Sequence, residues 1–158
     1  MRMDKFTARL QEALGEAQSL AVGQSHSAIE PVHLLLALLQ QSGGVAAPLL
    51  EKAGANPADV ITALKMAMDK LPTVGQFNGD VQLSQGLARL LNLADREAQQ
   101  RGDQYVSTEA LLLAACDDGG ELGKLFENAG IKKKVLAEKI QEVRGGEAVT
   151  DPNAEDKM

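Results

Sequence analysis

An internal duplication is the feature of this sequence that most constrains its fold. Three short motifs occur in the same order in each half: Leu-Leu-Leu-Ala (34–37 and 111–114), Gly-Gly (43–44 and 119–120) and Ala-Gly (53–54 and 129–130). Each copy on its own would leave its apolar faces exposed to water. The duplication therefore predicts two repeats related by a pseudo-two-fold axis and sharing one core, with repeat one over about 1–71 and repeat two over about 84–144.

Apolar side chains at three- and four-residue spacing predict an all-α fold of about eight helices, four in each repeat. Caps and breaks place these helices near 4–23, 31–42, 45–53, 57–71, 85–101, 108–118, 121–129 and 132–144. Asp4 is a good N-cap for the first helix, and Ser84 is a good N-cap for the fifth. The helix that opens at Pro31 is apolar on nearly every side, so we expect it to be central and buried.

Two stretches lack this periodicity. Residues 72–83 contain Gly75, Asn78-Gly79 and Asp80, and they predict a connecting loop. Residues 147–158 are acidic and contain Pro152, and they predict a flexible linker. The folded domain is therefore expected over residues 1–146.

Composition narrows the classes of function. Aromatic residues make up only 3% of the chain and the net charge is −6, whereas proteins that bind nucleic acids usually carry a basic stripe with stacking rings. No run approaches the ~18 apolar residues of a membrane span, and the start lacks the apolar stretch of a signal peptide. The single cysteine, Cys116, cannot form an internal disulfide, which is typical of a reducing compartment. We therefore expect a cytoplasmic protein that binds neither nucleic acid nor membranes.

Four segments add a resemblance to a known family: Met-Arg-Met-Asp-Lys-Phe-Thr at 1–7, Ile-Glu-Pro-Val-His-Leu at 29–34, Arg-Gly-Asp at 101–103 and Arg-Gly-Gly-Glu at 144–147. Together with the duplicated Leu-rich helix, they resemble the Clp repeat that precedes the AAA+ modules of Clp unfoldases, and the ClpB-type disaggregases in particular. The resemblance covers essentially the whole chain. It implies an N-terminal domain that ends just before a first nucleotide-binding module.

The resemblance implies a domain that is not an enzyme and that holds no cofactor, because ATP and magnesium would bind in the absent AAA+ modules. The Gly-rich stretch at 119–125 is no Walker loop, since its spacing is wrong and it lacks the hydroxyl that binds magnesium. The implied partners are unfolded or aggregated polypeptides, and the implied full-length protein is a homohexamer that cooperates with the DnaK chaperone system. The function we expect is capture of exposed apolar segments, which would be passed to an ATP-driven threading ring.

Leu93 is the first candidate for a binding surface. It falls off the apolar stripe of its helix when positions advance by about 100° per residue, although single exposed leucines are common on protein surfaces. A shallow apolar groove lined by Leu93 would lie beside the first helix. Tyr105, Val106 and Ala110, at the entry of the sixth helix, are its expected co-liners, and the small Ala110 side chain would keep the groove shallow.

Three polar positions match residues that the family resemblance implies beside such a groove: Thr7, Asp103 and Glu109. Each of them also has a structural interpretation. Thr7 can hydrogen-bond within its own helix, and Asp103 or Glu109 can complement the N-terminus of the sixth helix. Both interpretations stay open from the sequence.

Glu30 and His33 support a different class of function, a small metal-dependent helical enzyme. A carboxylate and an imidazole one turn apart occur in the metal sites of helical bundles. A lone pair leaves most of a coordination shell empty, however, and the equivalent positions of repeat two are Ser107 and Ala110. A structural His33 is therefore favoured. Among non-catalytic functions, the alternatives are docking of a folded adaptor, as in ClpA- or ClpC-type unfoldases, and a purely structural spacer.

Overall fold

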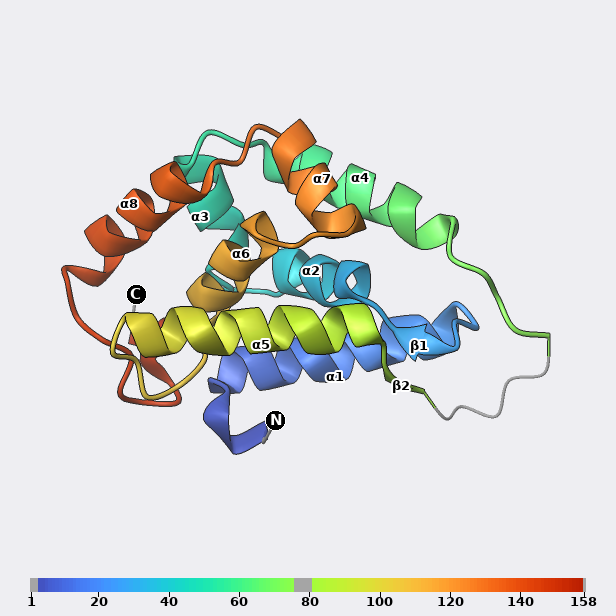
Figure 1. Ribbon diagram of the computed structural model, residues 1–158, viewed down its shortest axis with the longest axis horizontal. Helices are drawn as coiled ribbons and strands as arrows, with labels where there is room; N and C mark the ends of the chain where they lie inside the picture. The colour runs from blue at the N-terminus through green and yellow to red at the C-terminus, as the bar shows by residue number, and fades with distance from the viewer. Residues whose placement is uncertain (1–2, 76–80, 158) are drawn as a thin grey trace.

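The computed structural model describes residues 3–75 and 81–157, which form eight α-helices and one small sheet (Figure 1). The helices are α1 (Ala8–Gly23), α2 (Pro31–Gln40), α3 (Ala46–Lys52), α4 (Pro57–Asp69), α5 (Gln85–Gln100), α6 (Thr108–Cys116), α7 (Glu121–Asn128) and α8 (Lys133–Arg144). The other elements are strands β1 (Ala28–Ile29) and β2 (Gln82–Leu83) and the 3-10 turns η1 (Met3–Lys5) and η2 (Ala154–Lys157). The prediction of an all-α fold is confirmed. Within the described residues, no helix is long and apolar enough to cross a membrane.

The first helix begins later than expected. Thr7, not Asp4, is its N-cap, and the Thr7 hydroxyl accepts the backbone N–H of Leu10 at 3.3 Å. The Thr7 backbone is extended because its own N–H donates to the carbonyl of Val106 at 3.0 Å, across the repeat boundary. That tertiary contact ends the preceding 3-10 turn and sets the start of α1. The expected N-cap Ser84 is confirmed, since its hydroxyl accepts the N–H of Leu87 at 3.0 Å.

Two short parallel contacts cross between the repeats. β1 pairs with β2, with Ile29 opposite Leu83, and Phe6 pairs with Val106. Phe6 and Leu83 occupy equivalent positions of the two repeats, and so do Ile29 and Val106. Each repeat therefore places the residue before its first helix against the residue before the buried helix of the other repeat. This exchange is the pseudo-two-fold relation that the duplication predicts.

The segment expected as a connecting loop is partly ordered by these contacts. It contains β2, and Thr73 forms an antiparallel bridge with His26. Both pairings satisfy backbone N–H and C=O groups of this segment. Neither the residue types nor their spacing in the sequence predicts a strand here. Asn78-Gly79 and Asp80 lie outside the described residues.

A single apolar core runs through both repeats. Residues 32–39 of α2 are all buried, as expected for the central helix, and residues 108–115 of α6 are buried in the same way. α2 packs on α1 and α4, and α6 packs on α5 and α7. The outer helices cross between repeats, with α3 against α8 and α4 against α7 (Figure 1).

The end of the described chain departs from the flexible linker expected over 147–158. Val149 and Glu155 are both buried, and residues 154–157 form η2. The carbonyl of Val149 accepts the N–H of Gln104 at 2.7 Å, and the carbonyl of Pro152 accepts the N–H of Ala8 at 2.8 Å. Backbone bonds to distant parts of the chain order this segment, and composition carries no signal for them.

Candidate functional site

An apolar groove of about 390 Å³ lies between α1 and α5, which run side by side in Figure 1. It lies on the pseudo-two-fold, because Phe6 and Leu14 of repeat one line it together with their counterparts Leu83 and Leu91 of repeat two. The remaining lining residues are Met3, Gln11, Gly15, Gln18, Ile29, Ala88 and Asn92. None of these described residues carries a charge.

Two large apolar side chains are exposed at the rim of this groove. Met3 is 50% exposed and Leu83 is 49% exposed, whereas Phe6, Leu14 and Leu91 beneath them are buried. Large apolar side chains exposed next to a hollow mark binding surfaces more often than scattered ones do. The groove can therefore cover an apolar side chain of a partner without burying an unpaired charge.

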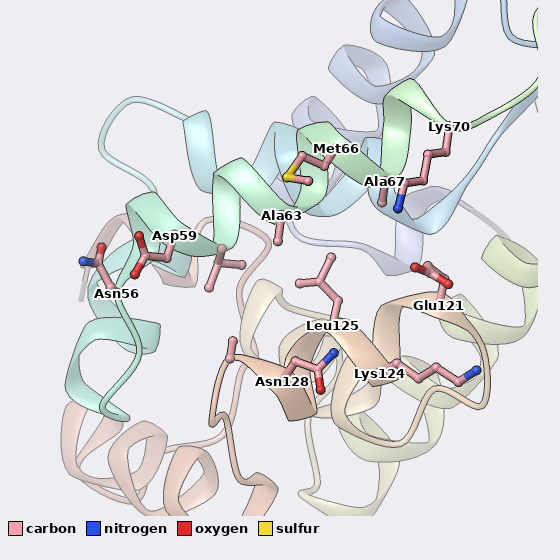
Figure 2. Close-up of a pocket in the computed structure, with 12 residues that line it drawn as sticks. Asn56, Asp59, Ala63, Met66, Ala67, Lys70, Glu121, Lys124, Leu125 and Asn128 are labelled. Atoms are coloured by element: carbon pink, nitrogen blue, oxygen red, sulfur yellow. The ribbon is translucent and has the colours of Figure 1, made fainter.

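A second hollow, of about 520 Å³, opens between α4 and α7 (Figure 2). Its floor includes Ala63 and Leu125, which point toward each other across the cleft, and Met66 beside them is 58% exposed. Four charged residues stand along this cleft: Asp59, Lys70, Glu121 and Lys124. An apolar segment that filled the cleft would desolvate charges of both signs, which is costly. The α1–α5 groove is the better candidate for an apolar ligand.

The seven residues predicted from the sequence do not lie in this groove, which is lined by other described residues. Val106 and Ala110 are buried in the core. Leu93 is partly buried and packs against the core, and Tyr105 is also partly buried. Their role in binding stays a prediction, and the structure gives the two buried ones a packing role.

Thr7, the first of the three polar candidates, is fully buried. Its hydroxyl donates to Oε2 of Glu155 at 2.6 Å and also caps α1. Glu155 itself is only 3% exposed, and its Oε1 accepts the backbone N–H of Thr108 at 2.6 Å. Desolvation raises the pKa of Glu155, although its hydrogen bonds act in the opposite direction. Thr7 therefore holds the C-terminal segment rather than facing solvent.

Asp103 and Glu109, the other two polar candidates, form a buried ionic cluster with Arg144. The guanidinium of Arg144 donates to both carboxylate oxygens of Asp103 at 3.1 Å and lies 3.5 Å from Oε2 of Glu109. These side chains are 0%, 1% and 4% exposed for Asp103, Glu109 and Arg144. Sequence reasoning missed the role of Arg144, because nothing in its local pattern points across the fold to residue 103.

The Glu30–His33 pair acts as a helix start rather than a metal site. His33 Nδ1 accepts the N–H of Glu30 at 2.8 Å. Because a neutral imidazole has one acceptor and one donor nitrogen, His33 Nε2 is the donor, and it donates to His26 Nδ1 at 2.9 Å. Burial, and secondarily His26, lowers the pKa of His33 to about 4. Both ring nitrogens of His33 are thus occupied. Among the described residues, no three His, Cys, Asp or Glu side chains gather into a metal-binding group.

The fold, the duplicated repeats and the groove on their pseudo-two-fold define a Clp-type N-terminal domain. The family model for the Clp repeat (R) N-terminal domain matches residues 5–143. The chain belongs to this family. The matched sequence is this domain and contains no ATPase module.

The relatives are ClpB chaperones. The chain is 53% identical over 156 residues to the chaperone protein ClpB of Pseudomonas putida and 47% identical to that of Vibrio cholerae. Each comparison covers 99% of this chain and 18% of the relative. The chain thus spans less than a fifth of the length of these chaperones, at their N-terminal end.

Solved structures share the fold. The Hsp104 N-terminal domain from Candida albicans matches with a TM-score of 0.80 at 23% identity, covering 96% of this chain and 99% of that one. A ClpV N-domain, solved as a complex with a VipB peptide, matches with a TM-score of 0.70 at 22% identity, covering 93% and 91%. At these identities the likeness extends to the fold alone.

Proposed function

We propose that this domain binds exposed apolar segments of misfolded or aggregated polypeptides in the α1–α5 groove and passes them to an ATP-driven threading ring. One observation carries the proposal. Half-exposed apolar side chains, Met3 and Leu83, meet at a hollow whose described lining has no charge. Misfolded polypeptides differ in sequence, but all of them expose apolar side chains. An uncharged apolar groove can therefore bind many such sequences weakly.

The relatives and neighbours support this class of ligand. The relatives are chaperones, and a ClpV N-domain of the same fold binds a peptide. The groove lies at the junction of both repeats, so a client would contact the two halves of the domain at once. The expected setting is the cytoplasm, in a homohexamer that works with the DnaK system, and the domain would need no cofactor of its own.

Docking of a folded adaptor is the alternative use of the same surface. The α4–α7 cleft favours it more than the groove does, because a folded partner can match the charges at its rim (Figure 2). A stable complex with a native adaptor that persists after the groove is altered would favour this alternative.

Replacement of one exposed residue in each hollow tests the proposal. Leu83→Ser removes a half-exposed apolar side chain from the groove rim, and Met66→Ser removes one from the α4–α7 cleft. Covering the exposed half of a Leu side chain is worth about 1 kcal/mol, which is about fivefold in Kd. We expect Leu83→Ser to weaken binding of a reduced, unfolded model protein about fivefold, and Met66→Ser to change it less than twofold.

Titration of the labelled domain, followed by NMR, measures both affinities and maps the contact. Shifts in the wild-type domain should concentrate along α1 and α5. Equal losses for the two variants, or shifts confined to α4 and α7, would contradict the groove. A thermal melt of each variant checks that neither substitution unfolds the domain.

A further inference from the structure

Residues 149–157 pack against a surface, here called the seat, that is formed by the starts of α1 in repeat one and α6 in repeat two. The segment passes the N-terminus of α1 and the N-terminus of α6, which begin at Ala8 and Thr108. The first N–H groups of any helix lack partners inside the helix. Here the carbonyl of Pro152 accepts the N–H of Ala8, and Glu155 Oε1 accepts the N–H of Thr108. One segment thus caps two helices that belong to different repeats.

Hydrogen-bond donors and Arg9 face the acidic side chains of this segment. Helix N-termini carry partial positive charge and favour carboxylates, and the Glu155 side chain lies at the start of α6. Asp156 pairs with Arg9 of α1 at 2.8 Å. The Glu155 carboxylate accepts hydrogen bonds from the Thr7 hydroxyl and the Thr108 N–H, each at 2.6 Å. An acidic segment is therefore the kind of ligand that the surface fits.

The upstream end of the segment is held by the buried ionic cluster. The N–H of Val149 donates to Oδ1 of Asp103 at 2.9 Å, and the Val149 carbonyl accepts from Gln104. Asp103 is oriented for this contact by its paired bonds to Arg144. Removal of the segment would leave the Asp103 carboxylate and the N-terminus of α6 without these partners.

We propose that residues 149–157 are an intramolecular ligand of the paired N-termini of α1 and α6, an acidic strap that docks and releases as one unit. Thr7 and Asp103 are positioning residues for this strap. In the docked state the strap fixes where the chain leaves the domain. In the released state the domain is tethered loosely and the starts of α1 and α6 are open to solvent. This inference is independent of what the groove binds.

Amide hydrogen exchange of the whole 158-residue chain, read by NMR, tests the strap. Four amides report on it: Ala8, Gln104, Thr108 and Val149. Opening of a local unit exposes all its amides together. In the wild-type chain we expect these four to be protected and to exchange at similar opening free energies. Glu155→Ala should speed their exchange about tenfold and leave α3 and α4 unchanged.

Glu147→Ala is the matched control, because Glu147 is exposed and lies just before the strap. It should leave all four amides unchanged. Asp156→Ala is the milder variant, since it removes one exposed ion pair and no buried group, and it should speed exchange about twofold. Exchange of Val149 at coil rates in the wild-type chain would overturn the strap. Equal exchange rates in the Glu155→Ala and Glu147→Ala chains would also overturn it. If Glu155→Ala fails to fold, Asp156→Ala takes its place in the test, and unchanged exchange in that variant would overturn the strap.

Discussion

The buried helices α2 and α6 hold equivalent places in the two repeats, but they begin in different ways. α2 begins with groups close in sequence, its N-cap Glu30 and the ring of His33. His33 Nδ1 accepts the N–H of Glu30, and the other ring nitrogen of His33 meets His26 at 2.9 Å. Repeat one therefore satisfies the start of its buried helix from within.

α6 begins with charged groups, and one of them comes from far along the chain. Ser107 caps it locally by accepting the N–H of Ala110 at 3.2 Å. Glu155 supplies the carboxylate that accepts the N–H of Thr108, and Arg144 neutralises Asp103 beside it. Repeat two thus depends on the segment that follows its last helix.

The comparison shows how a duplicated scaffold can specialise. Either solution satisfies the first N–H groups of a buried helix, so the fold tolerates both. They differ in what they connect. The first turn of α2 is satisfied by residues near it in sequence, whereas the first turn of α6 also depends on the C-terminal strap. Three predictions test this difference, in order of decreasing effect.

Conversion of the charged cluster toward its neutral counterpart has the largest expected effect. Arg144→Met introduces the residue that repeat one has at the equivalent position, Met68 of α4. It leaves the buried carboxylates of Asp103 and Glu109 without their cation. Removing one partner of a buried pair costs about 3–5 kcal/mol. We expect the free energy of unfolding in urea to fall by about that amount. Lys139→Met, at an exposed ion pair of α8, should cost less than 1 kcal/mol.

The pH dependence of stability should differ in sign between the two helix starts. His33 has a folded pKa of about 4 against an ordinary value of 6.5. The unfolded chain therefore binds its proton more readily, and the contribution of His33 is present above pH 6.5 and lost as the pH falls toward 4. The full contribution is on the order of 3 kcal/mol. Urea unfolding between pH 7 and 4.5 measures it, and His33→Gln should flatten the curve.

Glu155 contributes with the opposite sign. Burial raises its pKa, so the docked strap binds a proton more tightly than the free strap does. Its contribution is present below the ordinary value of 4.5 and lost as the pH rises through the raised pKa. Glu109 of α6 adds to this shift, while Arg9 of α1 lies close enough to interact with the charge. Strap amides that become better protected as the pH rises would contradict this sign.

The equivalent caps of α1 and α5 give the smallest effect. Thr7 and Ser84 both cap a helix, but only the Thr7 hydroxyl also donates to a buried carboxylate. Loss of a cap costs about 1 kcal/mol, and loss of a charged hydrogen bond costs about 1.5 kcal/mol or more. We therefore expect Thr7→Ala to destabilise the domain about twice as much as Ser84→Ala in thermal melts. Equal costs would show that Glu155 does not depend on Thr7.

The periodicity predicted the helices well because each depends on residues close in sequence. The Gly-Gly breaks and the Ser84 cap mark real helix ends, and the apolar run after Pro31 marks a real buried helix. The start of α1 was misplaced because the carbonyl of Val106 holds Thr7 in an extended conformation. No local pattern around residue 4 carries that information.

The candidate site was less accessible to sequence reasoning. Leu93 departs from the apolar stripe of its helix, yet its side chain packs against the core. Leu83 lay in a segment expected as loop, and it rims the groove because its backbone pairs with Ile29. Exposure of a leucine is set by what packs over it, and helical spacing describes only its own helix.

The sequence by itself determined the class of fold, the duplication and the absence of a Walker loop, since all three follow from local patterns and their repetition. Only the tertiary structure decided how the duplicated halves differ. The Arg144 cluster and the Glu155 strap join residues that are distant in sequence, and the pseudo-two-fold brings Phe6 to the same groove as Leu83. Long-range pairing of charges and backbone groups leaves no periodic trace. The duplicated sequence pattern therefore predicts the scaffold, but it does not predict the surface contacts that distinguish the two repeats.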